Sequence, residues 1–259
     1  MNRNQRPSSG GQADLSRRQF LKSSSLVTSS AVVASNFPFI TTGHAAPDDP
    51  IRVGLIGCGG RGAGAAANAL EAASNVKVVA LADLFQDRLD QCRQQLKAKG
   101  VEVSDDHCFT GFEAYQKLLA LEEINYAILA TSPHFRPIHL RVAVEAGKHA
   151  FIEKPVAVDS TGVRSVILSG DMAQKKGLSI VAGTQRRHSA DYQETIKRLR
   201  DGAIGEILAG RTYYNTGTLW HRGRKPEWTE MEYQCRNWYY FTWLSGDHIV
   251  EQHIPTSIS

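Results

Sequence analysis

A glycine-rich turn between a short apolar run and a stretch of small residues constrains the fold of this chain more than any other feature. The apolar run is Ile51–Ile56, and glycines follow it at positions 57, 59 and 62, the spacing of a G-x-G-x-x-G motif. Residues 63–70 then have helical character. A strand, a glycine turn and a helix in this order predict a dinucleotide-binding unit.

Each glycine has its own expected task in such a unit. Gly57 permits the tight turn, Gly59 lets backbone amides approach a pyrophosphate, and Gly62 lets the helix pack closely on the strand. The pyrophosphate then lies at the positive end of the helix. The expected cofactor-binding residues of this loop are Gly57, Cys58, Gly59, Gly60, Arg61 and Gly62.

An aspartate supports the dinucleotide interpretation. Asp83 ends a second strand pattern, residues 76–82, and lies 21 residues after Gly62. A carboxylate there accepts hydrogen bonds from the adenosine ribose and repels a 2′-phosphate, which favours NAD over NADP, with NADP as the alternative. The competing interpretation is a glycine-rich turn in an unrelated α/β domain with an ordinary aspartate at a strand end.

The rest of this region alternates strand and helix patterns. We expect strands at residues 107–109, 125–130, 149–153 and 178–183, and helices at 85–99, 112–121, 137–146 and 161–176. Such alternation predicts a doubly wound Rossmann sheet of parallel strands with helices on both faces. Its ligands lie beyond the carboxyl ends of the strands, where we also expect the loop of Thr131, Ser132, Pro133 and His134.

The basic charge of the chain is concentrated at its N-terminus. Up to residue 46 there are five basic residues and one acidic residue, and the net charge of the whole chain is +4, so the remainder is balanced. No nucleic-acid partner is indicated. Arg17 and Arg18 precede Phe-Leu-Lys and a mildly apolar stretch, which resembles a twin-arginine export signal. We expect export to the periplasm by the twin-arginine machinery, with a membrane anchor or a basic tail as the alternatives.

The cysteines do not indicate a metal site. Cys58, Cys92, Cys108 and Cys235 form no C-x-x-C pair. We interpret all four as structural, although an oxidising compartment would permit a disulfide.

The sequence Glu153-Lys154-Pro155 closes the strand pattern at 149–153. A lysine at the carboxyl end of such a strand points into the cofactor crevice, where it can bind a substrate hydroxyl or carry a proton. The proline fixes the backbone of the turn. The simpler alternative is a surface lysine in a turn.

Together these motifs resemble the glucose-fructose oxidoreductase and inositol dehydrogenase-like family over about residues 51–188. The resemblance rests on the glycine loop, Asp83, the 130–134 loop, Glu-Ala-Gly-Lys-His at 145–149 and Glu-Lys-Pro at 153–155. It implies that Lys154 contacts nicotinamide and substrate, that Glu153 and Pro155 shape the nicotinamide pocket, and that residues 131–134 touch the cofactor. It also implies hydride transfer between NAD(P) and a carbinol carbon of a sugar, polyol or derivative. Some relatives are instead glycosidases that use bound NAD for a transient oxidation.

We expect three parts: the signal segment at 1–46, a Rossmann domain at 47–188 and, by the family resemblance, a shortened α+β substrate domain at 189–259. In this last part we expect a helix around residues 192–199 and a strand at 206–214. Its many aromatic side chains suit sugar faces, but most of them suit a core or a subunit interface better. A homo-oligomer is compatible with this resemblance, because the family's second sheet often joins subunits.

Near the end of the sequence, Asp247, His248, Glu251 and His253 form a candidate acid/base cluster beside Lys154. In a helix, Asp247 and Glu251 would share one face. The alternative is a hydrated loop or helix start. The family places a histidine four residues after the acid, where this chain has Pro255. A non-catalytic dinucleotide-binding remnant therefore stays an alternative.

Overall fold

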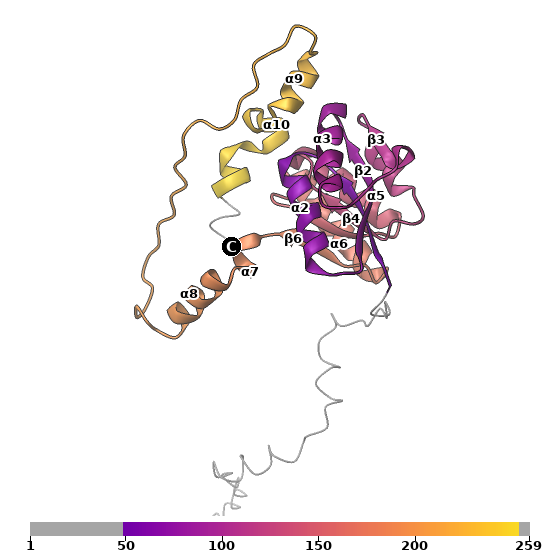
Figure 1. The fold of residues 1–259 in the computed structure, drawn as a ribbon. Coiled ribbons are helices and arrows are strands. Elements are labelled where there is room, and N and C mark those ends of the chain that lie inside the picture. Colours follow the sequence, from indigo (N-terminus) through magenta and orange to yellow (C-terminus); the bar gives the residue numbers. More distant parts are fainter. Residues whose placement is uncertain (1–48, 254–259) are drawn as a thin grey trace, which may run out of the picture. The chain divides into compact units, whose positions relative to one another are not determined.

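The computed structural model describes residues 49–253, and a six-stranded parallel sheet forms its centre (Figure 1). The strand order is β3-β2-β1-β4-β5-β6. The strands are β1 (Ile51–Ile56), β2 (Val76–Asp83), β3 (Cys108–Thr110), β4 (Tyr126–Leu129), β5 (His149–Glu153) and β6 (Ile180–Gly183). The order reverses between β1 and β4, which is where a doubly wound sheet opens a crevice for a ligand.

Helices connect the strands, as the alternating sequence pattern predicts. They are α2 (Gly60–Ala72), α3 (Gln86–Lys97), α4 (Ala114–Leu119), α5 (Arg136–Glu145) and α6 (Ser160–Lys175), with short 3-10 turns η2 (Asp105–His107) and η3 (Pro133–Phe135). The predicted Rossmann architecture is therefore confirmed. The predicted helix at 112–121 is wrong at its start, because Phe112 lies outside α4 with 55% of its surface exposed.

The strand register brings the functional loops to one edge. Ile56 of β1 pairs with Ala82 of β2 on one side and with Leu129 of β4 on the other. Leu129 in turn pairs with Ile152 of β5. The carboxyl ends of four neighbouring strands are thus level, so the loops that follow them meet beside one another.

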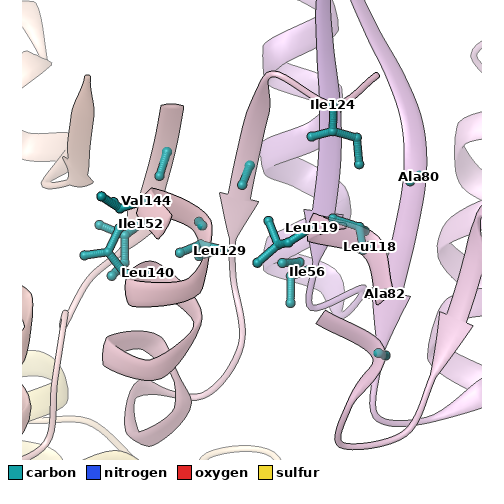
Figure 2. Packing of buried hydrophobic residues seen from close by; sticks show 14 of the residues in the cluster. Ile56, Ala80, Ala82, Leu118, Leu119, Ile124, Leu129, Leu140, Val144 and Ile152 are labelled. Atoms are coloured by element: carbon teal, nitrogen blue, oxygen red, sulfur yellow. The ribbon is translucent and has the colours of Figure 1, made fainter. Parts of the chain in front are cut away.

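Two apolar clusters hold helices on the two faces of the sheet. Figure 2 shows one face, where Leu118 and Leu119 of α4 and Leu140 of α5 pack against Ile56, Leu129 and Ile152. On the other face, α2 and α3 pack through small and apolar side chains, including Ala66 and Leu89. Burial of this apolar surface supplies the main driving force for the sheet.

The chain after β6 is helical or irregular. It contains α7 (Gln185–His188), α8 (Ala190–Arg200), α9 (Glu230–Arg236), η4 (Trp238–Tyr240), α10 (Thr242–Ser245) and a π-helical turn, η5 (Ile249–His253). The predicted helix around 192–199 is confirmed as α8. The strand predicted at 206–214 is wrong, since this stretch has no regular structure and Leu208 is 86% exposed. A strand is stable only beside other strands, and no described segment after Gly183 provides one.

The signal segment predicted at residues 1–46 lies outside the described residues. Within residues 49–253, the helices are too short or too polar to cross a membrane.

Candidate active site: a dinucleotide crevice with a lysine at its edge

The glycine loop joins β1 to α2 in a conformation that requires two of its glycines. Gly57 has a φ of 98°, and a Cβ on it would lie 2.7 Å from backbone atoms of Ala130 and Thr131. A Cβ on Gly62 would lie 1.8 Å from the carbonyl oxygen of Gly57. The loop, the start of α2 and the end of β4 therefore approach too closely for any side chain.

Gly59 differs from these two because it faces open space. It is the N-cap of α2, it has no side chain to cap the helix, and a Cβ on it would meet no atom within 4 Å. The first amides of a helix have no partner inside the helix and carry partial positive charge. The bare start of α2 is thus a cradle that fits a pyrophosphate, and the task expected of Gly59 stays a prediction.

Asp83 ties the glycine loop to the end of β2. One carboxylate oxygen accepts a hydrogen bond from the Cys58 amide at 2.6 Å, and the other accepts one from the Phe85 amide at 2.8 Å. Burial raises the pKa of Asp83, although both amides oppose that shift. A carboxylate oxygen can accept more than one hydrogen bond, so these two amides leave Asp83 able to accept bonds from a ribose. Ribose binding by Asp83 stays a prediction.

Lys154 lies at the end of β5, as the sequence predicts. Its Nζ donates hydrogen bonds to the Glu251 carbonyl at 2.7 Å and to Glu251 Oε1 at 2.8 Å. Glu251 is only 6% exposed, whereas the Lys154 side chain is 29% exposed. The ammonium of Lys154 therefore reaches solvent and is paired with a buried carboxylate.

Two arginines flank this pair. Arg61, in the first turn of α2, donates to Glu153 Oε1 at 2.7 Å. Arg136, the first residue of α5, donates through Nη1 to the carbonyl of Pro155 at 2.6 Å. The peptide bond between Lys154 and Pro155 is cis. Lys154 is thus bracketed by two residues that each contact an arginine.

One cavity of about 660 Å³ connects the glycine loop with Lys154. Most of the predicted site residues line it: Gly57, Gly59, Gly60, Arg61, Gly62, Asp83, Thr131, Ser132, Glu153, Lys154 and Glu251. The predicted residues Cys58, Pro133, His134 and Pro155 do not line it. Cys58 contributes its amide to Asp83, and Pro155 contributes its carbonyl to Arg136.

The predicted acid/base cluster is only partly assembled, because Glu251 alone of its described side chains lines the cavity. His248 is directed elsewhere: Nδ1 lies 2.8 Å from the Tyr239 hydroxyl and Nε2 lies 3.2 Å from the Tyr214 carbonyl. Asp247 has a φ of 71° and accepts a hydrogen bond from the His248 amide.

Asp247 and Glu251 are expected to share one face if the segment is helical; Glu251 lies in η5 and lines the cavity, whereas Asp247 precedes η5 and does not line it. Gly246 ends α10 in the left-handed region with a φ of 77°, and Asp247 continues in that region, so the chain turns before η5 begins. The side chain of His253 lies outside the described part of the structure.

The loop after β4 is stabilised by aromatic contacts and a buried histidine. Thr131 Oγ1 lies 3.2 Å from Nδ1 of His139, and burial, with the charge of Arg136 acting in the same direction, lowers the pKa of His139 to about 3. His139 is therefore neutral at physiological pH. The His134 ring packs edge-on against Trp243, with ring centroids 5.1 Å apart.

The terminal helices cover the crevice beside the end of β2 through a contact that the sequence did not reveal. Arg236 of α9 donates to both oxygens of Asp87 at 3.0 Å. Its guanidinium lies over the rings of Phe85 and Trp228, at 3.9 and 4.8 Å from their centroids. Arg236 also lines the cavity. This contact, which we call the Arg236 latch, fastens α9 to the first turn of α3.

None of the four cysteines within residues 49–253 forms a disulfide. A hydrogen bond with the Cys92 thiol, together with burial, raises the pKa of Cys58 well above its ordinary value. Within residues 49–253, no group of three or more histidine, cysteine or acidic side chains is arranged to hold a metal ion.

The family model described as "Oxidoreductase family, NAD-binding Rossmann fold" matches residues 51–184, just over half of the chain. The chain belongs to the GFO/IDH/MocA oxidoreductase family. The matched range runs from the start of β1 to the residue after β6, and so includes the glycine loop, Asp83 and Lys154. Membership of an NAD-binding family agrees with the cradle at the start of α2.

Individual relatives cover the chain further. A glycosyl hydrolase family 109 protein from Shewanella pealeana is 26% identical over 223 residues, which are 80% of this chain and 47% of the relative. An inositol 2-dehydrogenase/D-chiro-inositol 3-dehydrogenase from Halalkalibacterium halodurans is 31% identical over 164 residues, 62% of this chain and 43% of the relative. The chain thus spans about half the length of these curated relatives.

Among solved structures, myo-inositol 2-dehydrogenase from Lactobacillus plantarum has a TM-score of 0.52 and 25% identity. The match covers 62% of this chain and 44% of the dehydrogenase.

Proposed function

We propose that the protein transfers a hydride between a nicotinamide dinucleotide and a hydroxyl-bearing carbon of a sugar, polyol or derivative. The observation that carries this proposal is the pairing of Lys154 with buried Glu251 in the same cavity that the glycine loop lines. The similarity to inositol dehydrogenases supports the substrate class.

The residues of the chain have distinct tasks in this reaction. The start of α2 and the glycine loop hold the pyrophosphate, and Asp83 binds the adenosine ribose. The dinucleotide, when bound, supplies the ring carbon that accepts the hydride. Thr131 and Ser132 line the same cavity as the glycine loop and Lys154, where they would contact the bound cofactor.

Lys154 handles the proton of the substrate. Lys154, whose side chain reaches solvent, first releases one ammonium proton to water. As the C–H bond loses its hydride, the resulting amine takes the hydroxyl proton, and a carbonyl results. Glu251 Oε1, 2.8 Å from Nζ, stabilises the ammonium that forms. We assign no step to His248, because both of its ring nitrogens contact Tyr239 or Tyr214.

The test is NADH formation by the full chain with a panel of inositols, aldoses and polyols, followed at 340 nm with NAD and with NADP. Lys154→Met should lower kcat by about a hundredfold or more, the usual contribution of a general base, while its thermal unfolding stays cooperative. Lys97→Met is the matched control, because Lys97 is exposed and pairs with Glu102. Turnover that survives Lys154→Met would contradict the assignment.

A second candidate function is glycoside cleavage with the same cofactor. The similarity over 80% of the chain to a glycosyl hydrolase family 109 protein favours it. Release of the aglycone from aryl glycosides without net NADH would identify this reaction, whereas net NADH identifies a dehydrogenase.

We also propose that the twin-arginine machinery exports the protein to the periplasm. The proposal is supported by Arg17-Arg18 followed by Phe-Leu-Lys and a mildly apolar stretch. The twin-arginine route carries folded proteins, so the dinucleotide can be bound before export.

A further inference from the structure

The position of Arg136 departs from two general rules of protein structure. It is the first residue of α5, where the positive end of the helix disfavours a cation. It is also only 5% exposed, although arginine is seldom buried without a carboxylate partner. Residues that break local rules cluster at functional sites.

The contacts of Arg136 connect it to the turn that carries Lys154. Nη1 donates to the carbonyl of Pro155 at 2.6 Å, directly after Lys154 in the chain. The carboxylates of Glu153 and Glu251 are close enough to favour the charged form of its guanidinium, although burial lowers its pKa to about 10. Arg136 thus bonds the residue after Lys154 and feels the charge of the carboxylates of Glu153 and Glu251.

Stability alone does not explain this arrangement. Among the described residues, two buried side-chain polar atoms have no hydrogen-bond partner, Arg136 Nε and Glu251 Oε2. Each such atom costs free energy. Both residues line the same cavity as Lys154, so the unfavourable free energy of these two atoms arises at the candidate site.

We propose that Arg136 is the positioning residue of this site: it pins the Pro155 carbonyl in the cavity that it lines together with Lys154 and Glu251, and so holds the Lys154 ammonium at the crevice. The inference rests on the proposed function of Lys154. Without Arg136, the turn is anchored only through Glu153 and β5, and Lys154 leaves Glu251 more often.

The test measures Lys154 directly. The full chain is acetylated with sulfo-N-hydroxysuccinimide acetate, and peptide mass spectrometry gives the rate at Lys154 relative to exposed Lys97. Arg136→Gln should raise this ratio at least threefold, and Arg136→Lys, which keeps the charge, should raise it less. Arg141→Gln is the matched control, because Arg141 lies on the same helix and pairs only with Glu145 on the surface. It should match the parent.

A parental or slower rate at Lys154 in folded Arg136→Gln and Arg136→Lys would overturn the proposal. If Arg136→Gln shows no cooperative unfolding, the rate in Arg136→Lys decides: a rise supports the proposal and a parental or slower rate overturns it. With any substrate found in the panel, Arg136→Lys should lower kcat about tenfold with little change in KM. If no substrate is found, the proposed function fails, but the acetylation rates still decide the role of Arg136.

Discussion

Substitution of Gly62 and of Gly59 by alanine separates the packing of the glycine loop from its binding role. A Cβ on Gly62 would lie 1.8 Å from the Gly57 carbonyl oxygen, whereas real contacts are at least 3.0 Å, so α2 and the loop must separate by roughly 1.2 Å. Such overpacking costs about 1–3 kcal/mol, and the neighbour here is rigid backbone, which favours the upper end. At about 2–4 °C per kcal/mol for a chain of this size, Gly62→Ala should lower Tm by roughly 6–12 °C.

Gly59→Ala is the matched variant with the opposite outcome. The backbone of Gly59 has φ −66° and ψ 176°, which alanine adopts without strain, and its Cβ would meet no protein atom. We expect Tm within about 2 °C of the parent, measured by far-UV circular dichroism. Because the new methyl group projects into the crevice, NADH affinity in a fluorescence titration should fall at least tenfold. Parental Tm in Gly62→Ala, or parental NADH affinity in Gly59→Ala, would refute the reasoning.

Three further outcomes are expected. Because His139 is neutral when folded, with a pKa near 3 against about 6.5 when unfolded, its contribution to stability is complete above pH 6.5 and is lost as pH falls toward 3. In His139→Gln, the free energy of unfolding obtained from urea melts should depend less steeply on pH in this window, by the equivalent of up to one bound proton. An unchanged pH slope would show that His139 is not the source of this dependence. Arg236→Met should lower the free energy of unfolding by about 2 kcal/mol, since it removes charge-assisted bonds to Asp87; equal urea midpoints would show that the latch does not stabilise the fold. Replacement of Arg17 and Arg18 by lysine should leave the protein in the cytoplasmic fraction on immunoblotting, whereas continued export would exclude the twin-arginine route.

The sheet could be predicted because its signals are local. Each strand is a short apolar run that ends at a turn residue, and β5 has the predicted bounds, His149–Glu153. The positions of Asp83 and Lys154 followed from the same pattern, since both end strands that face one edge. Local propensity failed at the start of the helix predicted at 112–121 and at the strand predicted at 206–214, where no neighbouring strand is present in the described residues.

The chemistry around Lys154 depends on contacts that no local pattern encodes. Four residues at 247–253 were candidates, and the left-handed backbone of Gly246 and Asp247 decides that Glu251 reaches the lysine. Gly246 was a signal in the sequence that a helix ends before Asp247, because glycine is common just after the last residue of a helix. His248 looked equally suitable in the sequence but serves to anchor Tyr239.

The two structural arginines were missed for a different reason. The residues next to Arg136 and Arg236 in the sequence give no sign that either arginine is buried, yet both are largely buried in the structure. One signal was present for Arg136, since it directly precedes Pro137, and proline favours the first turn of a helix. A cation at that helix end needs a special partner, which here is the Pro155 carbonyl.

The partner of Lys154 lies 97 residues further along the chain. A ribosome adding roughly 5–20 residues per second needs about 5 to 20 s to make that stretch. By then, every strand of the sheet and the whole glycine loop have been synthesised. Glu251, which completes the proton-handling pair, is therefore the last residue of the cavity lining to be synthesised.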